Sequence, residues 1–327
     1  MRAQVLKAYG GPEMLQLADV ERPAARSGEV LIRIRATSIN PVDIKIREGL
    51  PIGPELPAIL GADLAGTVEA VGTGVDDFNV GDEVYGCAGG VKGVGGTLAE
   101  YIAADARLIA PKPRALTFRE AAALPLVSIT AWEAIERIAP KKGEAILVQG
   151  GVGGVGHIAV QLAAIAGAVV SASVGTDRDF EKARSFGAAN VIDYKNDPVA
   201  SFVQRITGGR GFDAIVDTAG GQNLVKSFEA AAVGGRIATT NSRASVDLGQ
   251  MHGKALSLHL VFMLLPMLSG EGRDKHGRIL REIAALADRG LLRPHVDPER
   301  FTLETAADAH RHVSSGKSKG KVVIEVD

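Results

Sequence analysis

The sequence of 327 residues contains one cysteine, Cys87. A lone cysteine excludes an internal disulfide and a metal cage built from several thiolates. Aromatic residues make up only 4% of the chain, so we expect no stacking platform for single-stranded nucleic acid. Neither sign of charge is in excess, since 37 Lys and Arg face 38 Asp and Glu for a net charge of −1. Such a chain has no single-sign field to attract nucleic acid or acidic lipid, so we expect neither as a partner.

Long hydrophobic runs are also missing. The most apolar stretch, residues 255–268, is shorter than the ~18–20 residues that span a bilayer, and it contains His259 and Pro266. We expect it to form a buried strand followed by the start of a helix. The first residues show no apolar segment ahead of a small-residue cleavage site, so no signal peptide is apparent. The expectation is a cytoplasmic protein.

Glycine, in contrast, is abundant, with 40 residues, which is typical of tight turns and close backbone approaches. Short runs such as 30–35 and 66–71 are separated by glycine and aspartate, the pattern of a small antiparallel barrel or sandwich. Thr117 and Glu120 have capping-box spacing and are expected to open an Ala-rich helix. Strand-like runs then alternate with helical ones, at 145–148, 168–174, 190–192, 212–216, 236–240 and 257–262.

This alternation is typical of a parallel sheet wrapped by helices. We therefore predict an α/β protein with two domains. Residues 1–120 and 265–327 form a β-rich domain, and residues 121–264 form an inserted α/β domain. The C-terminal return is expected to contain helices at 277–289 and 304–313 and a strand at 321–326.

A glycine-rich loop follows the first strand of the α/β region. Gly151, Gly153 and Gly156 fit the pattern G-x-G-x-x-G, before a helix expected to begin near His157. Gly151 would allow the tight turn, Gly153 the approach of a pyrophosphate, and Gly156 the packing of helix on strand. The N–H groups and positive dipole end of the helix would face the phosphates. A structural glycine-rich turn is the alternative to a dinucleotide site, whose residues would be Gly151, Val152, Gly153, Gly154, Val155 and Gly156.

The end of the second strand bears on the choice of cofactor. An NAD-specific site would place Asp or Glu there, but this sequence has Ser173 and Thr176. The missing carboxylate removes a repulsion of up to ~4 kcal/mol against a 2′-phosphate at ~4 Å and an effective dielectric of ~20. Arg178 could add a charge-assisted hydrogen bond of roughly 1.5–3 kcal/mol, or be a solvated residue at a helix start. The sequence therefore favours NADPH.

Patterns of other catalytic sites are missing. The histidines contain no H-x-x-x-H pair, and no tyrosine is followed by lysine four residues later. The nicotinamide must then carry the chemistry, while the protein orients it and stabilises developing charge.

Several segments together resemble the motifs of the medium-chain dehydrogenase/reductases. They are residues 38–43, 61–66, 80–84, 96–101 and 151–156, in this order, and the match extends to 316–323. The chain most resembles the zinc-independent quinone oxidoreductase (zeta-crystallin-like) branch. The resemblance implies a GroES-like catalytic domain, a Rossmann domain with a doubly wound parallel sheet, and a homodimer. The dimer contact would extend the Rossmann sheet near Leu256–Phe262.

The resemblance also places the positions at which zinc-dependent relatives hold their catalytic metal. They fall on Asn40, on Ala62-Asp63 and near Leu126. Asp63 alone cannot hold Zn²⁺, which takes three protein ligands and an open position, so we predict no metal site. Without a Lewis acid, hydride transfer should favour acceptors that delocalise charge, such as quinones and α,β-unsaturated carbonyls.

The same match suggests catalytic residues. Asn40 is the candidate oxyanion donor, unless it only shapes the turn before Pro41. Asp43 is expected to orient that loop. Lys45 could be the proton donor, with an exposed lysine as the alternative. Thr130 resembles the residue near the nicotinamide, with a helix cap as the alternative.

Further cofactor contacts are expected in the α/β domain. Tyr194 resembles the residue that borders the adenosine 2′-phosphate, and Thr218 and Asn241 end two later strands, at the sheet edge where ligands bind. Phe262 could wall the nicotinamide pocket or pack in the core. Lys317 could reach back to the cofactor or be solvated.

The leading hypothesis is an NADPH-dependent, zinc-independent oxidoreductase that transfers hydride to a quinone or an α,β-unsaturated carbonyl. Two alternatives stay open: an NAD(P)-linked alcohol dehydrogenase of the same superfamily, and a non-catalytic NADPH-binding protein.

Overall fold

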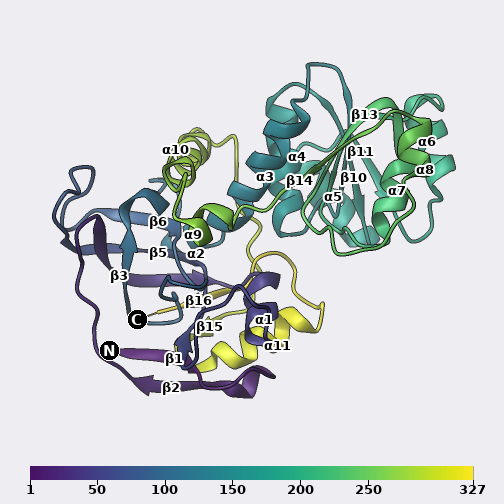
Figure 1. The fold of residues 1–327 in the computed structure, drawn as a ribbon. Coiled ribbons are helices and arrows are strands. Elements are labelled where there is room, and N and C mark those ends of the chain that lie inside the picture. The colour runs from purple at the N-terminus through teal and green to yellow at the C-terminus, as the bar shows by residue number, and fades with distance from the viewer. Residues whose placement is uncertain (327) are drawn as a thin grey trace. The chain divides into compact units, whose positions relative to one another are not determined.

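The computed structural model describes residues 1–326; residue 327, the last of the predicted first domain, lies outside the described residues. The chain divides into two compact units (Figure 1). The first unit contains Met1–Ile129 and the segment from Leu264 onward, and the second contains Thr130–Met263. The sequence places these divisions after residues 120 and 264. The helix α3 (Pro125–Ile138) runs across the first division.

The first unit is rich in antiparallel strands, which confirms the predicted β-rich domain. Its larger sheet has the order β15-β16-β3-β5-β6-β8, and β7 also pairs with β3. A smaller sheet has the order β2-β1-β4. The strands are β1 (Arg2–Leu6), β2 (Leu15–Asp19), β3 (Glu29–Ser38), β4 (Ala58–Ile59), β5 (Asp63–Val71), β6 (Glu83–Cys87), β7 (Tyr101–Asp105), β8 (Ile109–Pro111), β15 (Phe301–Thr302) and β16 (Val323–Glu325).

Several helices follow these strands along the chain. Thr117 caps α2 as predicted, since its hydroxyl accepts from the N–H of Glu120 at 3.3 Å and its own N–H donates to the Glu120 carboxylate at 2.9 Å. The expected Ala-rich helix is divided, because Pro125 lacks the N–H that would continue the first helix. The helices are α1 (Pro41–Arg47), α2 (Phe118–Ala122), α3, α9 (Leu265–Ser269), α10 (Asp274–Asp288) and α11 (Ala306–Ser314).

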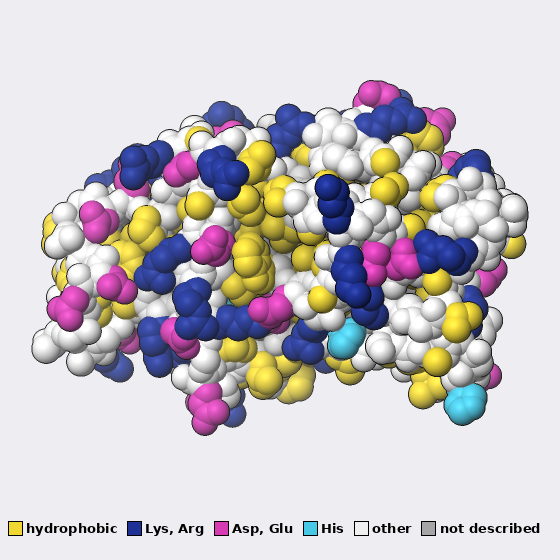
Figure 2. Space-filling view, turned by 90° about the horizontal axis from the view of Figure 1, so that it is seen from above, with side chains coloured by type: hydrophobic (Ala, Val, Ile, Leu, Met, Phe, Trp, Pro, Cys, Tyr) yellow, Lys and Arg dark blue, Asp and Glu magenta, His cyan; other side chains and the backbone are white. Residues whose placement is uncertain are grey.

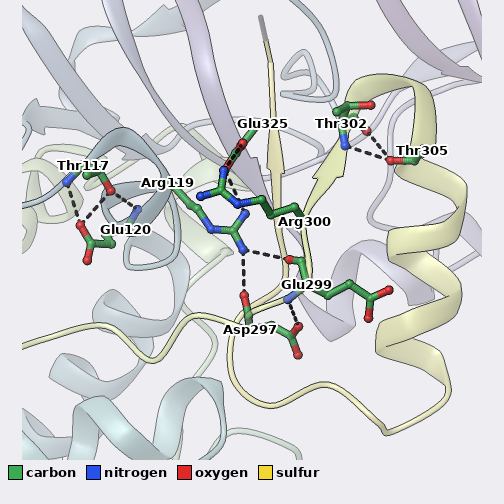
Figure 3. A network of polar contacts seen from close by, with 9 residues as sticks. All are labelled: Thr117, Arg119, Glu120, Asp297, Glu299, Arg300, Thr302, Thr305 and Glu325. Carbon is green, nitrogen blue, oxygen red and sulfur yellow. Dashed lines mark hydrogen bonds and ion pairs between the residues drawn. The ribbon is translucent and has the colours of Figure 1, made fainter.

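Arg119 joins the C-terminal segment to α2 (Figure 3). Its guanidinium donates to the main-chain oxygens of Asp297 at 2.8 Å and Glu299 at 2.9 Å, and to the carboxylate of Glu325 at 3.1 Å. Arg300 donates to the same carboxylate at 3.0 Å. These bonds fix the return of the chain that brings β16 beside β3.

The second unit is a doubly wound parallel sheet, as predicted. Its order is β11-β10-β9-β12-β13-β14, so the chain moves outward from β9 and then returns past it to β12. In Figure 1, α4 lies on one side of this sheet and α6, α7 and α8 on the other. The elements are β9 (Ala145–Gln149), α4 (Gly154–Ile165), β10 (Val169–Val174), α5 (Phe180–Ser185), β11 (Asn190–Asp193), α6 (Val199–Thr207), β12 (Phe212–Asp217), α7 (Asn223–Ala230), β13 (Ala231–Thr239), α8 (Gly249–Gly253) and β14 (Ser257–Leu260).

The core of this unit is aliphatic and aromatic, with Leu147, Phe212, Ile215 and Phe228 buried between sheet and helices. Binding sites in such sheets lie at the carboxyl ends of the strands, beside the point where the order reverses. In this unit that point lies between β9 and β12.

The apolar stretch near residue 260 differs from its prediction. The sequence predicts a buried strand, but β14 is an edge strand that pairs with β13 alone among the strands of residues 1–326, and Leu260 is 52% exposed. Phe262 is 48% exposed, so its interpretation as a core residue is wrong. An apolar run alone does not distinguish a central strand from an edge strand. No helix within residues 1–326 has the length and apolar character needed to cross a membrane.

Candidate active site

A cluster of buried polar side chains lies where β3, β5 and the segment before β16 meet. Asn40 is the N-cap residue of α1, Asp63 begins β5, and Lys321 precedes β16. The antiparallel register pairs Val323 with Ser38, which places Lys321 opposite Asn40. We refer to Asn40, Asp43, Asp63 and Lys321 as the Asp63 cluster.

Asp63 is the centre of this cluster, and both of its carboxylate oxygens are engaged. Oδ2 accepts from the hydroxyl of Ser38 at 2.7 Å and from Nδ2 of Asn40 at 2.8 Å, and lies 3.4 Å from Nζ of Lys321. Oδ1 accepts from the main-chain N–H of Leu126 at 2.8 Å. Asp63 and Asn40 are both fully buried. A buried carboxylate of this kind requires such partners, because an unpaired charge is costly in a protein interior.

Each of the three N–H bonds of the Lys321 ammonium has an acceptor. It donates to the main-chain oxygen of Ile39 at 2.9 Å, to Oδ1 of Asn40 in a short contact, and to Oδ2 of Asp63. Burial lowers the pKa of Lys321 from its usual value, while the carboxylates of Asp63 and Asp43 act in the opposite direction. The ammonium is therefore a buried cation that the surrounding oxygens stabilise.

Asp43 holds the loop between β3 and α1. Its carboxylate accepts from the N–H of Asn40 at 2.8 Å, and its own N–H donates to the main-chain oxygen of Asn40 at 3.0 Å. Burial raises the pKa of Asp43 to about 7, although the hydrogen bond from the Asn40 backbone opposes this rise. Asp43 therefore titrates close to neutral pH.

The raised pKa of Asp43 makes stability depend on pH. The unfolded carboxyl ionises near 3.8 and the folded one only near about 7, so unfolding releases a proton between these values and stability falls as the pH rises through this window. Asp43→Asn keeps an oxygen that can accept from Asn40 and removes the ionisation. In the wild type we expect the free energy of unfolding to decrease by roughly 4 kcal/mol across this window, and in the variant we expect no such decrease. Urea unfolding at several pH values from 4 to 8 measures the difference, with the exposed Asp76→Asn as control. Equal slopes for Asp43→Asn and the wild type would contradict the prediction.

The glycine loop joins β9 to α4. Gly150 has a φ of +71°, so the left-handed residue of the turn is Gly150 and not Gly151 as the sequence suggests. A Cβ atom at Gly151 would lie 2.6 Å from Cβ of Ala172, and one at Gly156 would lie 2.0 Å from the main-chain oxygen of Gly150. Gly151 therefore serves close packing on β10. Gly156 allows the first turn of the helix to approach the loop.

The loop fits the diphosphate of a dinucleotide. Gly153 is the N-cap residue of α4, and no side chain caps this helix. The helix begins at Gly154, earlier than predicted, so Gly154, Val155 and Gly156 form its first turn, whose N–H groups have no partner within the helix. Such N–H groups and the helix dipole bind anions.

A cavity of 240 Å³ lies at the carboxyl ends of β9, β10 and β11 in the same unit. Ser173 and Tyr194 line it, as do Gln149, Asn223 and Lys226, which sequence analysis missed. Ser173 lies close to the glycine loop, since its hydroxyl accepts from the N–H of Gly150 at 3.2 Å. Gln149 could have been found from its position directly before the glycine loop. Asn223 and Lys226 carry no such signal in the sequence, because they lie on α7, far along the chain.

Comparisons with known proteins agree with this geometry. A family model described as an alcohol dehydrogenase GroES-like domain matches residues 26–114, and one described as a zinc-binding dehydrogenase matches residues 186–324. The quinone oxidoreductase of Rattus norvegicus is 32% identical over 99% of this chain and 97% of its own length. This chain belongs to the quinone oxidoreductase branch of the medium-chain dehydrogenase/reductases. It is therefore an oxidoreductase of a nicotinamide-dependent family, and the predicted GroES-like and Rossmann folds are confirmed.

Two further medium-chain dehydrogenase/reductases are similar over nearly the whole chain. The chloroplastic NADPH-dependent alkenal/one oxidoreductase of Arabidopsis thaliana is 31% identical over 99% of this chain and 79% of its own length. The crystal structure of an alcohol dehydrogenase superfamily protein from Novosphingobium aromaticivorans has a TM-score of 0.96 and 41% identity, with 100% of both chains covered.

The three positions that the family resemblance assigns to the metal ligands of zinc-dependent relatives lie together, since Asp63 accepts from both Asn40 and Leu126. Their chemistry does not fit zinc. Among these three positions Asp63 is the single carboxylate, Leu126 contributes an N–H donor, and Oδ1 of Asn40 accepts from Lys321. A zinc site needs three ligands with free lone pairs, whereas a protonated lysine offers none.

Two other predicted catalytic residues lie outside this cluster. Lys45 is exposed on α1. Thr130 is nearly buried inside α3, which begins at Pro125, so the helix-cap alternative for Thr130 is wrong. The amide of Asn40 contacts Asp63 and Lys321, so the contacts of Asn40 extend beyond the turn before Pro41.

The remaining predicted residues of the Rossmann unit lie at or near the strand ends. The hydroxyl of Thr218 donates to the main-chain oxygen of Gln149 at 2.6 Å. The side-chain amide of Asn241 donates to the main-chain oxygen of Ala219 at 3.2 Å. These bonds connect the ends of neighbouring strands.

Beyond β10, the hydroxyl of Thr176 donates to the carboxylate of Asp179 at 2.8 Å, and Arg178 is exposed in the turn between them. Lys317 is exposed in the first unit.

A different group of potential ligands lies in the C-terminal segment. One atom from each of Asp297, Glu299 and His312 lies within 4.8 Å of the others. The Asp297 carboxylate accepts from the N–H groups of Glu299 and Lys319 and faces His312 at 3.2 Å. Although burial raises it, these N–H donors and His312 lower the pKa of Asp297 overall. Because the Asp297 oxygens already accept these bonds, the Asp297 carboxylate joins the segment before β15 to α11 and to the segment before β16.

Proposed function

We propose that this chain is a zinc-independent oxidoreductase that transfers hydride from NADPH to a quinone or an α,β-unsaturated carbonyl. The observation that carries the proposal is the Asp63 cluster, in which a lysine ammonium and hydrogen-bond donors surround the carboxylate at the relatives' metal position. The names of the rat and Arabidopsis relatives support this class of acceptor. An NAD(P)-linked alcohol dehydrogenase is disfavoured, because a simple ketone or alcohol needs stronger stabilisation of the oxyanion.

Each unit has its own part in this proposal. When bound, the nicotinamide supplies the hydride. The first turn of α4 holds the diphosphate, with Ser173, Thr176, Arg178 and Tyr194 near the adenosine phosphate. In the first unit, Asn40 donates one N–H of its amide to Asp63, and no hydrogen bond to a residue within 1–326 uses the second. This second N–H is the proposed donor to the oxygen that gains negative charge.

Thr130, Lys45, Thr218, Asn241, Phe262 and Lys317 remain candidates for contacts with substrate or cofactor. The cytoplasmic location stays a prediction, as does the absence of a nucleic-acid partner. Figure 2 shows positive and negative side chains interspersed on the face that it displays, which supports the latter.

Turnover assays test the proposed function. NADPH and NADH are each offered with a panel of quinones, enones and aldehydes, before and after treatment with EDTA. We expect oxidation of NADPH by a quinone or enone, unchanged by chelation. Loss of turnover with EDTA would contradict zinc independence. Tight NADPH binding without turnover across the panel would favour the non-catalytic alternative.

Arg178 provides a test of the cofactor preference. Its guanidinium is exposed beside the end of β10 and available to a 2′-phosphate. Arg178→Ala should weaken NADPH binding about tenfold or more, because a hydrogen bond to a charged group contributes roughly 1.5–3 kcal/mol, and it should leave NADH binding unchanged. Fluorescence titration measures both, and Arg184→Ala, on α5, is the control. An equal loss for the two cofactors would refute this role of Arg178.

The edge strand β14 is the proposed dimer contact. An unpaired strand edge with exposed apolar side chains favours pairing with another chain, and Leu260 and Phe262 are about half exposed. Leu260→Lys is expected to shift a dimer toward monomer in sedimentation velocity at micromolar concentration. A wild type that sediments as a monomer would refute the homodimer, and a variant that remains dimeric would place the contact elsewhere.

A further inference from the structure

The amide of Asn40 is held between a donor and an acceptor. Oδ1 faces the ammonium of Lys321, which can only donate, and Nδ2 faces the carboxylate of Asp63 at 2.8 Å, which can only accept. The reversed orientation of the amide would place N–H against N–H and oxygen against oxygen. The pair therefore fixes which way the amide points, and with it the direction of the second N–H.

The charge of Lys321 also acts on the electrons of this amide. A cation at the carbonyl oxygen draws charge from the nitrogen, which makes the remaining N–H a stronger donor, and hydrogen bonds in series strengthen one another in a low-dielectric interior. Lys321 is only 4% exposed, so water screens this effect little.

Lys112 is a second buried lysine, and it provides a comparison for Lys321. It donates to the main-chain oxygens of Pro113 at 3.0 Å and Leu116 at 2.5 Å, and it pairs with the carboxylate of Glu83 at 3.2 Å. Lys321 differs in that it also donates to a side-chain amide, that of Asn40, and in that its carboxylate partner Asp63 is fully buried whereas Glu83 is exposed.

We propose that Lys321 is a positioning residue that replaces the metal cation of zinc-dependent relatives and that fixes and polarises the Asn40 amide as the donor to the substrate oxygen. This inference rests on the proposed function for its catalytic part. Its structural part, the orientation of the amide, does not depend on turnover.

Hydrogen exchange of the Asn40 carboxamide tests the structural part. The protein is labelled with ¹⁵N-asparagine, and the resonance that is lost in Asn40→Ala identifies the group. In Lys321→Met, which keeps the length of the side chain and removes its charge, we expect exchange with solvent at least tenfold faster. Lys112→Met should leave exchange unchanged. An unchanged rate in Lys321→Met would overturn the proposal.

Kinetics of the same proteins test the catalytic part. Lys321→Met should lower kcat at least tenfold and leave the Kd of NADPH within threefold. The double variant Asp63→Asn/Lys321→Met removes both buried charges, so it should regain thermal stability relative to Lys321→Met but keep the lowered kcat. Lys112→Met should lose stability and keep kcat.

Recovery of kcat in the double variant would overturn the proposal, since Lys321 would then only neutralise Asp63. One zinc ion per wild-type chain after dialysis, by elemental analysis, would overturn it as well. A wild type without turnover would refute the proposed function instead, and the exchange rates would then decide the role of Lys321 alone.

Discussion

Gly156→Ala is expected to weaken NADPH binding about 100-fold or more. The added Cβ would lie 2.0 Å from the main-chain oxygen of Gly150, and neither atom belongs to a flexible side chain that can turn away. The loop and the first turn of α4 must therefore separate. The N–H groups would then no longer converge on the diphosphate, and losing two hydrogen bonds to a charged group, at roughly 1.5–3 kcal/mol each, weakens binding about 100-fold or more.

Fluorescence titration with NADPH measures this loss, and circular dichroism checks that the Rossmann unit remains folded. Gly253→Ala is the matched control, because it lies in a helix of the same unit and its Cβ would meet nothing within 4 Å. If Gly156→Ala bound NADPH as tightly as Gly253→Ala does, the loop would not be the phosphate site.

Asn40→Ala should lower kcat by a factor of about 100 to 1,000 with little change in NADPH binding. Removal of one oxyanion donor has this effect in enzymes whose donors are preorganised. The change also leaves Asp63 and Lys321 each without one partner, so a loss of stability of about 1–3 kcal/mol is expected.

Ser38→Ala separates these two effects. It removes a comparable hydrogen bond to Asp63, of 2.7 Å, but no amide. Steady-state kinetics and urea unfolding of both variants provide the comparison, and we expect similar losses of stability with kcat lowered only in Asn40→Ala. An equal loss of kcat in Ser38→Ala would show that Asn40 has no role beyond supporting Asp63.

The Rossmann unit was the most predictable part of the chain. Its elements are local, and the glycine loop follows β9 directly, so periodicity and spacing were sufficient. Two details required the structure. The left-handed residue is Gly150, because sequence alone does not indicate φ, and β14 lies at an edge because apolar runs do not reveal the number of neighbouring strands.

The Asp63 cluster was predicted only in part. Asn40 and Asp63 could be found from motifs, but the sequence only places Lys321 at the start of the C-terminal strand and indicates no role for its side chain. Its role depends on the register of β16 against β3, a pairing of residues nearly the whole chain apart. Thr117 was identified by its local capping box, although the division of the following helix depended on Pro125.

The first unit is formed by two stretches of chain that are separated in the sequence by the Rossmann unit, and this has a consequence for biosynthesis. Lys321 is translated after the whole Rossmann unit, whose residues are contiguous from Thr130 to Met263. Since domains tend to fold as units during synthesis, the nascent chain can complete its nucleotide-binding sheet while Asp63 still lacks its ammonium partner. A ribosome stalled before Lys321 would thus carry a folded Rossmann sheet and an incomplete Asp63 cluster.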